Sequence, residues 1–129
     1  MTRRCLWAAN AYWGTPLRVG ANHYARRLVE RGWEVAFVSE PVSPRHWLRK
    51  AGRGESRDRL RVWRGGGGRD LDGKLFHYSP MTLLPHATPV GLRSRFVLDH
   101  WQRFTLPNVV RKLRREGFGQ VDLLVVDAV

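Results

Sequence analysis

Two acidic residues directly follow apolar runs that have the composition of buried strands. Asp127 follows "VDLLVV", and Glu40 follows "WEVAFVS". In doubly wound α/β folds ligands bind beyond the carboxyl ends of the strands, so both carboxylates stand where a substrate would lie. Asp127 is therefore the candidate catalytic base, which would take a proton from a hydroxyl group. Glu40 is a candidate for holding a substrate hydroxyl. The alternative for each is a structural role at the end of a loop.

A loop with two glycines joins the first two predicted strands. It contains Gly14 and Gly20, and a helix is predicted from Ala21 with His23 in its first turn. Free N–H groups at a helix start favour anions, so Gly14, Gly20 and His23 are candidate substrate-binding residues. The alternative for Gly20 is close packing of helix on strand. For His23 it is an ordinary surface or packing role.

The loop differs from the known phosphate-binding motifs. Gly14 and Gly20 are too far apart for G-x-G-x-x-G, and the absence of Gly-Lys-Ser and Gly-Lys-Thr excludes a P-loop. The histidines at 77, 86 and 100 lack the short spacings of zinc ligands, and one cysteine does not complete such a site. The sequence therefore predicts no metal site and no bound cofactor.

The elements that position these residues are a strand at Cys5–Ala9, a helix from Ala21 that ends at Gly32, and a strand at 33–39. A strand, a helix and a strand in this order form a right-handed parallel unit. The chain closes with "VDLLVVDAV", predicted as another buried parallel strand. The strand residues expected to be buried are Leu6, Ala8, Val35, Phe37, Leu124 and Val126.

The middle of the chain has a weaker pattern. We expect a short helix in "SPRHWLRKA", a polar loop in "GRGESRDR" and brief strands in "LRVW" and "LFHY". Four consecutive glycines between these strands indicate a mobile connection. A helical pattern returns over residues 92–116, with a break near Pro107.

These elements predict an α/β fold with a doubly wound, Rossmann-like parallel sheet and helices on both faces. The 129 residues suffice for one domain, spanning 1–129. We expect this domain to be truncated at its C-terminal end, because the loop that would complete a site after Asp127 is missing.

The net charge of +12 is carried almost entirely by arginine and favours anionic partners. The segments "RHWLRK" and "GLRSRFVLDHWQRFTLPNVVRKLRR" alternate basic with aromatic residues, which is typical of a surface that binds anionic lipid. Ordinary amphipathic helices packed on the sheet are the alternative. Signatures of a nucleic-acid-binding module are absent, so no specific nucleic acid is predicted. The expected anion-binding face contains Arg45, Arg49, Lys50, Arg93, Arg95, Arg111 and Arg114.

A single cysteine, Cys5, indicates a reducing compartment, and no apolar run is long enough to span a bilayer. We therefore expect a cytoplasmic protein that is peripheral on the inner face of the plasma membrane.

The stretch "ANAYWGTPLRVGANHYARRLVERGWEVAFVSE" resembles the opening of GT-B fold glycosyltransferases. There an apolar strand, a glycine-containing loop and the pattern H-x-x-x-L-x-x-x-G-H-E-V recur, with histidine where this chain has Trp33. The later segments "FHYSPMTLLP" and "VDLLVVDAV" resemble a strand with a proline-rich loop and a further strand of that family. The residues that match the opening pattern are Gly20, His23, Leu28, Gly32, Glu34 and Val35.

The resemblance implies the N-terminal, acceptor-binding domain of a sugar transferase for polysaccharide biosynthesis. Its acceptor would be a glycan or a lipid-linked sugar. The nucleotide-sugar would be a co-substrate bound mainly by a C-terminal domain that this chain does not contain, so this half is expected to be inactive alone. The alternative is a non-enzymatic basic α/β module that binds nucleic acid or another polyanion.

Overall fold

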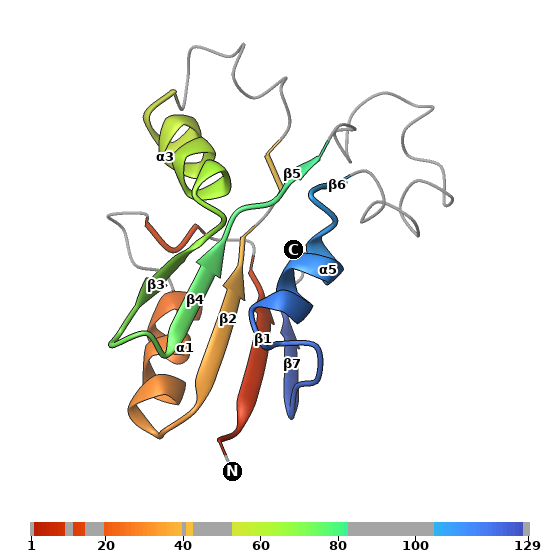
Figure 1. The fold of residues 1–129 in the computed structure, drawn as a ribbon. Helices are drawn as coiled ribbons and strands as arrows, with labels where there is room; N and C mark the ends of the chain where they lie inside the picture. Colours follow the sequence, from red (N-terminus) through yellow and green to blue (C-terminus); the bar gives the residue numbers. More distant parts are fainter. Residues whose placement is uncertain are drawn as a thin grey trace.

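The computed structural model describes residues 2–9, 12–14, 20–39, 41–42, 53–82 and 105–127. Within these ranges the chain is an α/β fold around a five-stranded sheet of order β3-β4-β2-β1-β7 (Figure 1). The strands of this sheet are β1 (Arg4–Ala8), β2 (Glu34–Val38), β3 (Gly68–Asp70), β4 (Leu75–Tyr78) and β7 (Leu123–Val126). A separate pair consists of β5 (Met81–Thr82) and β6 (Thr105–Leu106). The helices are α1 (Gly20–Glu30), α3 (Arg53–Arg64) and α5 (Val109–Arg115).

The predicted strand–helix–strand unit is confirmed. β1 and β2 pair in parallel with Leu6 opposite Ala36, and α1 connects them. The helix turns its small apolar residues Ala25 and Val29 to the sheet. The helix ends at Glu30, and Gly32 in the turn that follows has a φ of +87°, in the left-handed region that glycine adopts without strain.

The sheet is mixed, which corrects the prediction of a purely parallel sheet. β2, β1 and β7 run parallel to their neighbours, whereas β3 pairs antiparallel with β4. The connection between β3 and β4 is only residues 71–74, too short for the crossover that parallel strands require. It turns through positive φ at Leu71, Asp72 and Gly73.

Helices cover both faces of the sheet (Figure 1). On one face α1 packs against a core that includes Cys5, Trp7 and Phe37. On the other face α5 packs its Leu113 against a core that includes Phe76. Strands covered on both sides are apolar throughout, which explains why the strand positions were readable in the sequence.

The prediction was wrong for residues 53–64, which form the helix α3 rather than a polar loop followed by a strand in "LRVW". Leu60, Val62 and Trp63 are all half-buried. Leu60 and Trp63 are three residues apart and share a helix face, but four residues of mixed polarity also fit a strand.

The four glycines after α3 are closely packed, which corrects the prediction of a loose connection. Gly65 and Gly66 form the turn that ends the helix, and Gly68 begins β3. A Cβ atom on Gly67 would collide with the ring of Phe76. A Cβ atom on Gly68 would likewise collide with the ring of His77, so the close approach of backbone to side chain requires glycine at 67 and 68.

The strand β7 lies at the border of the sheet, so part of its predicted burial is wrong. Val35 and Phe37 are fully buried as expected. Leu124 and Val126 are 59% and 64% exposed, because among the described elements β7 pairs with β1 alone and no helix covers these two side chains. Leu6 and Ala8 are half-buried.

The predicted helix at 92–116 is described only from Val109, where α5 begins after the short strand β6. The side chain of Asn108 accepts hydrogen bonds from two N–H groups of the first turn. Gly117, with φ of +94°, follows the helix. The predicted helix at 43–51 lies outside the described residues. None of the described helices has the length and hydropathy needed to cross a membrane.

Candidate functional site

A row of small and polar residues lies one position beyond the carboxyl ends of the parallel strands. Asp127, Ala9 and Ser39 each donate a backbone hydrogen bond of 2.8–2.9 Å to the last residue of the neighbouring strand. The N–H of Ser39 donates to the carbonyl of Tyr78, the residue before Ser79, so Ser79 occupies the same position after β4. The four residues therefore continue the register of the sheet in the order Ser79, Ser39, Ala9, Asp127.

The alternation of side chains assigns this row to the face that α1 covers. Two residues earlier in the same strands stand Trp7 and Phe37, which belong to the core beneath α1. Ser39 and Ser79 are buried, whereas Asp127 is exposed. The row thus has an accessible carboxylate at one end and buried hydroxyls at the other.

Four buried polar atoms on this side lack hydrogen-bond partners within the described residues: Trp7 Nε1, Asn22 Oδ1, His77 Nδ1 and Ser79 Oγ. Asn22, in the first turn of α1, is 2% exposed and donates through Nδ2 to the carbonyl of Trp13 at 3.3 Å, but its Oδ1 has no donor. Ser79 is 1% exposed, and its Oγ is likewise unpartnered. Each such group costs about 1–3 kcal/mol. Asn22 Oδ1 requires a donor, and the Ser79 hydroxyl can donate or accept.

The turn after β1 is anchored toward β3. The ring of Trp13 packs edge-on against Phe37 at 5.2 Å, and its Nε1 donates to Asp70 at 3.1 Å. The guanidinium of Arg26 lies 6.0 Å from the same ring. A Cβ atom on Gly14 would lie 2.7 Å from the ring of Tyr12, so Gly14 permits this ring to fold over the turn.

The helix α3 brings a cation to this turn. The guanidinium of Arg59 lies 5.3 Å from the ring centroid of Tyr12, a cation–π distance. Sequence reasoning missed Arg59 because α3 was predicted as a loop and a strand. It also missed Asn22 and Ser79, whose burial follows only from tertiary packing.

The predicted site residues share one edge of the sheet but not one point on it. Gly14 lies in the turn held toward β3, whereas Asp127 follows β7 at the opposite border. Gly20 is the exposed first residue of α1. A Cβ atom there would meet only Tyr24, at 3.9 Å, so close packing does not require this glycine. His23 is exposed on α1, and Glu40 lies outside the described residues.

His77 is a further titratable group on the side of α1. Burial lowers its pKa, and the nearby Asp70 opposes this shift. The pKa of Asp70 is itself lowered by hydrogen bonds from the Leu71 backbone and from Trp13. His77 is therefore neutral at pH 7. Asp122 accepts a hydrogen bond of 2.8 Å from the backbone of Arg4 at the opposite end of the strands, which is a structural role.

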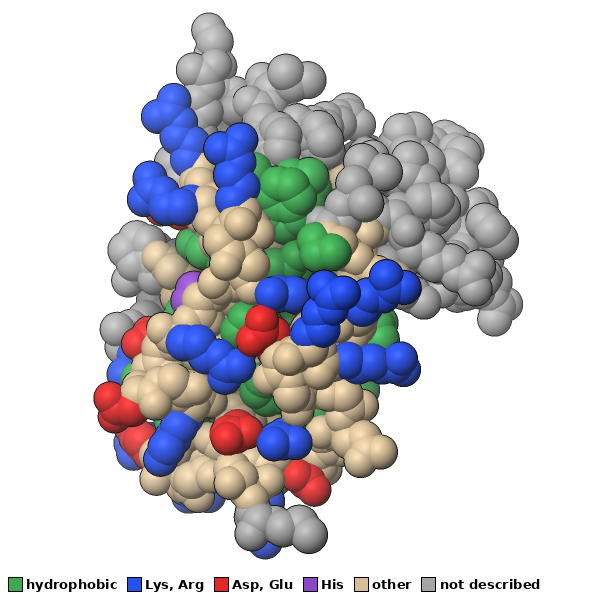
Figure 2. All heavy atoms as spheres, viewed as in Figure 1, with side chains coloured by type: hydrophobic (Ala, Val, Ile, Leu, Met, Phe, Trp, Pro, Cys, Tyr) green, Lys and Arg blue, Asp and Glu red, His purple; other side chains and the backbone are tan. Residues whose placement is uncertain are grey.

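Two residues of the predicted anion-binding face are described. Arg111 and Arg114 are exposed on α5, where Figure 2 shows a gathering of basic side chains. The other five predicted members, Arg45, Arg49, Lys50, Arg93 and Arg95, lie outside the described residues.

Comparisons of this chain with protein-family models, with curated proteins and with solved structures find no match. Among the described residues, no group of three His, Cys, Asp or Glu side chains is arranged to hold a metal ion. The proposed function therefore depends on the residues at the carboxyl edge of the sheet.

Proposed function

We propose that this chain is the acceptor-binding part of a glycosyltransferase of GT-B type, with a Rossmann-like fold. Its acceptor, a glycan or a lipid-linked sugar, binds along the row of residues 79, 39, 9 and 127. Asp127 is the general base. The nucleotide-sugar donor binds mainly to a second domain.

The observation that carries the proposal is the pair of unpartnered buried atoms, Asn22 Oδ1 and Ser79 Oγ. A sugar hydroxyl both donates and accepts, so it would satisfy either atom. A fully ionised phosphate only accepts and would leave Asn22 Oδ1 without a donor. Trp7 Nε1, on the same side, is a donor that either ligand would satisfy. Asn22 Oδ1 is therefore the atom that favours a ligand with hydroxyl groups.

The chemistry assigned to Asp127 is a single proton transfer. The acceptor hydroxyl gives its proton to the carboxylate as its oxygen forms a bond to the anomeric carbon of the donor. The bond from that carbon to the diphosphate breaks, and its electron pair leaves with the diphosphate. Arg59 stands on the same edge and would contribute positive charge toward the leaving group.

A glycan array tests the acceptor site with this chain alone. We expect binding to a subset of sugars, and Ser79→Ala should lower this affinity about tenfold while leaving the free energy of unfolding equal or higher. Removing a hydroxyl that has no partner costs the fold nothing. Asn108→Ala is the matched control, since it should destabilise by about 1 kcal/mol through loss of the cap but bind normally. The acceptor proposal fails if the array shows no binding, or if the two variants bind equally.

The division of labour between the two domains has a separate test. Calorimetry with UDP-glucose and GDP-mannose should show no micromolar binding to this chain, because most of the groups that hold the diphosphate are assigned to the other domain. Micromolar affinity would place the donor site here instead.

A further inference from the structure

Six exposed arginines form stripes on two helices. On α3, Arg57, Arg61 and Arg64 follow a spacing of four and three residues, which places them on one side of the helix. On α5, the exposed Arg114 and Arg115 follow Arg111 by three and four residues, which places them beside it on the helix surface. We call these six residues the arginine face.

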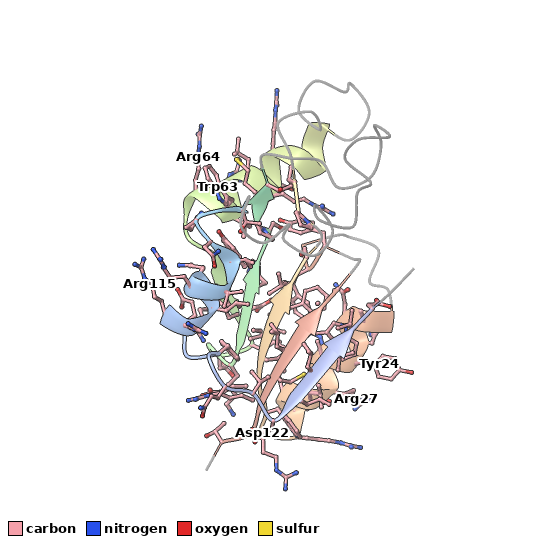
Figure 3. The ribbon with its side chains drawn as sticks, turned by 90° about the vertical axis from the view of Figure 1, so that its right-hand side faces the viewer. Tyr24, Arg27, Trp63, Arg64, Arg115 and Asp122 are labelled. Atoms are coloured by element: carbon pink, nitrogen blue, oxygen red, sulfur yellow. The ribbon has the colours of Figure 1, made fainter. Side chains whose placement is uncertain are left out.

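The two stripes lie on the same side of the molecule. Arg64 and Arg115 both project away from the sheet on the side opposite α1 (Figure 3). A Cβ atom on Gly66, in the turn that ends α3, would lie 3.1 Å from the Nζ of Lys112, so the Lys112 side chain of α5 reaches this turn. Trp63 of α3 packs against the core that contains Leu113 of α5.

The charge of the arginine face is not neutralised within the described residues. None of its six guanidinium groups has a hydrogen bond or an ion pair there. Elsewhere basic side chains do have acidic partners. Arg4 pairs with Glu34 at 3.1 Å, and Glu116 takes both Arg69 and Lys112 at 3.1 and 2.9 Å. Holding six like charges together without counter-charges favours an anionic partner that covers all of them.

We propose that the arginine face binds the surface of an anionic lipid bilayer. Val110, 43% exposed beside Arg111 and Arg114, offers an apolar group to the headgroup region. Lipid headgroups move laterally and can gather beneath a broad array of arginines. This inference does not depend on sugar transfer.

Vesicle sedimentation at 150 mM salt tests the proposal with this chain as it is. Vesicles of phosphatidylcholine with about one third phosphatidylglycerol should bind it, and phosphatidylcholine alone should not. Each basic residue contributes about a factor of five near an anionic surface, so the double variant R64E/R115E should bind at least roughly thirtyfold more weakly. Val110→Ser should weaken the binding that survives at high salt.

The matched control is the double variant R27E/R31E, which makes the same change in net charge on α1 and in the turn that follows it. Arg27 projects on the opposite side of the molecule (Figure 3). This control should bind within about threefold of the parent chain. Equal losses in the two double variants would show that net charge alone acts and would overturn the proposal.

Nucleic acid is the competing outcome. Fluorescence anisotropy with a labelled 20-base-pair duplex and a 20-nucleotide RNA, at the same salt, should give weak binding that R64E/R115E and R27E/R31E reduce alike. No binding to vesicles, together with tight nucleic-acid binding lost only in R64E/R115E, would assign the arginine face to nucleic acid and refute the bilayer.

Discussion

Asp127 differs from most other acidic residues at the scale of single side chains. Asp70, Asp122 and Glu116 accept hydrogen bonds that fix them in the fold. The carboxylate of Asp127 is exposed and has no hydrogen bond or ion pair within the described residues. Only its backbone is held, through the carbonyl of Ala8. A carboxylate that the fold does not use is available to a substrate.

Asp127→Asn should therefore separate catalysis from folding. In the complete transferase, turnover should fall about a hundredfold or more, because the amide does not accept the proton, while acceptor binding should change little. Steady-state kinetics with the acceptor varied would measure both. Turnover close to that of the parent enzyme would reduce Asp127 to a structural residue.

The buried thiol of Cys5 makes the free energy of unfolding depend on pH. Burial raises the pKa of its thiol from 9.0 to about 11. Between these values the unfolded chain loses the thiol proton and the folded chain keeps it, so stability is full below pH 9 and falls as the pH rises toward 11. At pH 10.5 this loss should be about 2 kcal/mol.

Guanidinium unfolding at pH 8 and pH 10.5, compared between the parent chain and Cys5→Ala, isolates this contribution. Both chains will lose stability from other groups, and the variant should lose less. Identical pH dependences would mean that Cys5 does not stay protonated in the fold.

At the scale of elements, the turn between α3 and β3 depends on glycine for two reasons. Gly67 has a φ of +100°, and a Cβ atom there would meet the ring of Phe76. Gly73, in the turn between β3 and β4, has a φ of +79° but open space around it. A side chain at Gly73 would therefore meet backbone strain alone, whereas a side chain at Gly67 would meet backbone strain and a steric collision.

Gly67→Ala should lower the free energy of unfolding by about 3 kcal/mol, and Gly73→Ala should lower it by about 1 kcal/mol. Alanine is strained by the positive φ at both positions, but only at position 67 does its Cβ atom also collide with a neighbour. Chemical denaturation measures both values. Equal losses would show that Phe76 moves aside, and that the packing of this turn is adaptable.

At the scale of the whole molecule, the border strand β7 leaves an apolar surface uncovered. Leu124 and Val126 point to the same face of the sheet as α5. The helix packs over the neighbouring strands and leaves these two side chains of β7 exposed. An exposed apolar strand with unpaired backbone groups is a template for pairing with another strand.

Val126→Lys should therefore reduce association of this chain at high concentration without loss of stability, since the residue is 64% exposed. Sedimentation velocity over a range of concentrations would detect the change. The control is Val110→Lys on α5, which is also exposed but lies away from the strand edge. Association that persists in the β7 variant would place the contact elsewhere.

The sequence by itself was enough to predict the elements whose apolar residues repeat at a regular spacing over a few neighbouring positions. The helix at 20–30, the turn at Gly32 that follows it and the flanking strands were predicted correctly. Burial on both faces of a strand, or on one face of a helix, imposes a periodicity that the residues themselves display. The position of Asp127 at the end of a parallel strand followed from the same reasoning, since parallel strands end at a common edge.

Only the tertiary structure decided the features that depend on neighbours distant in the chain. "LRVW" fits a strand as well as a helix, and packing on the core around Leu113 selects α3. Leu124 is as apolar as a buried strand residue, yet its exposure depends on what stands beside β7. The unpartnered atoms of Asn22 and Ser79 are likewise products of long-range contacts, which single-sequence periodicity does not encode. The same holds for the placement of α3 and α5 on one side of the sheet, which assembles the arginine face.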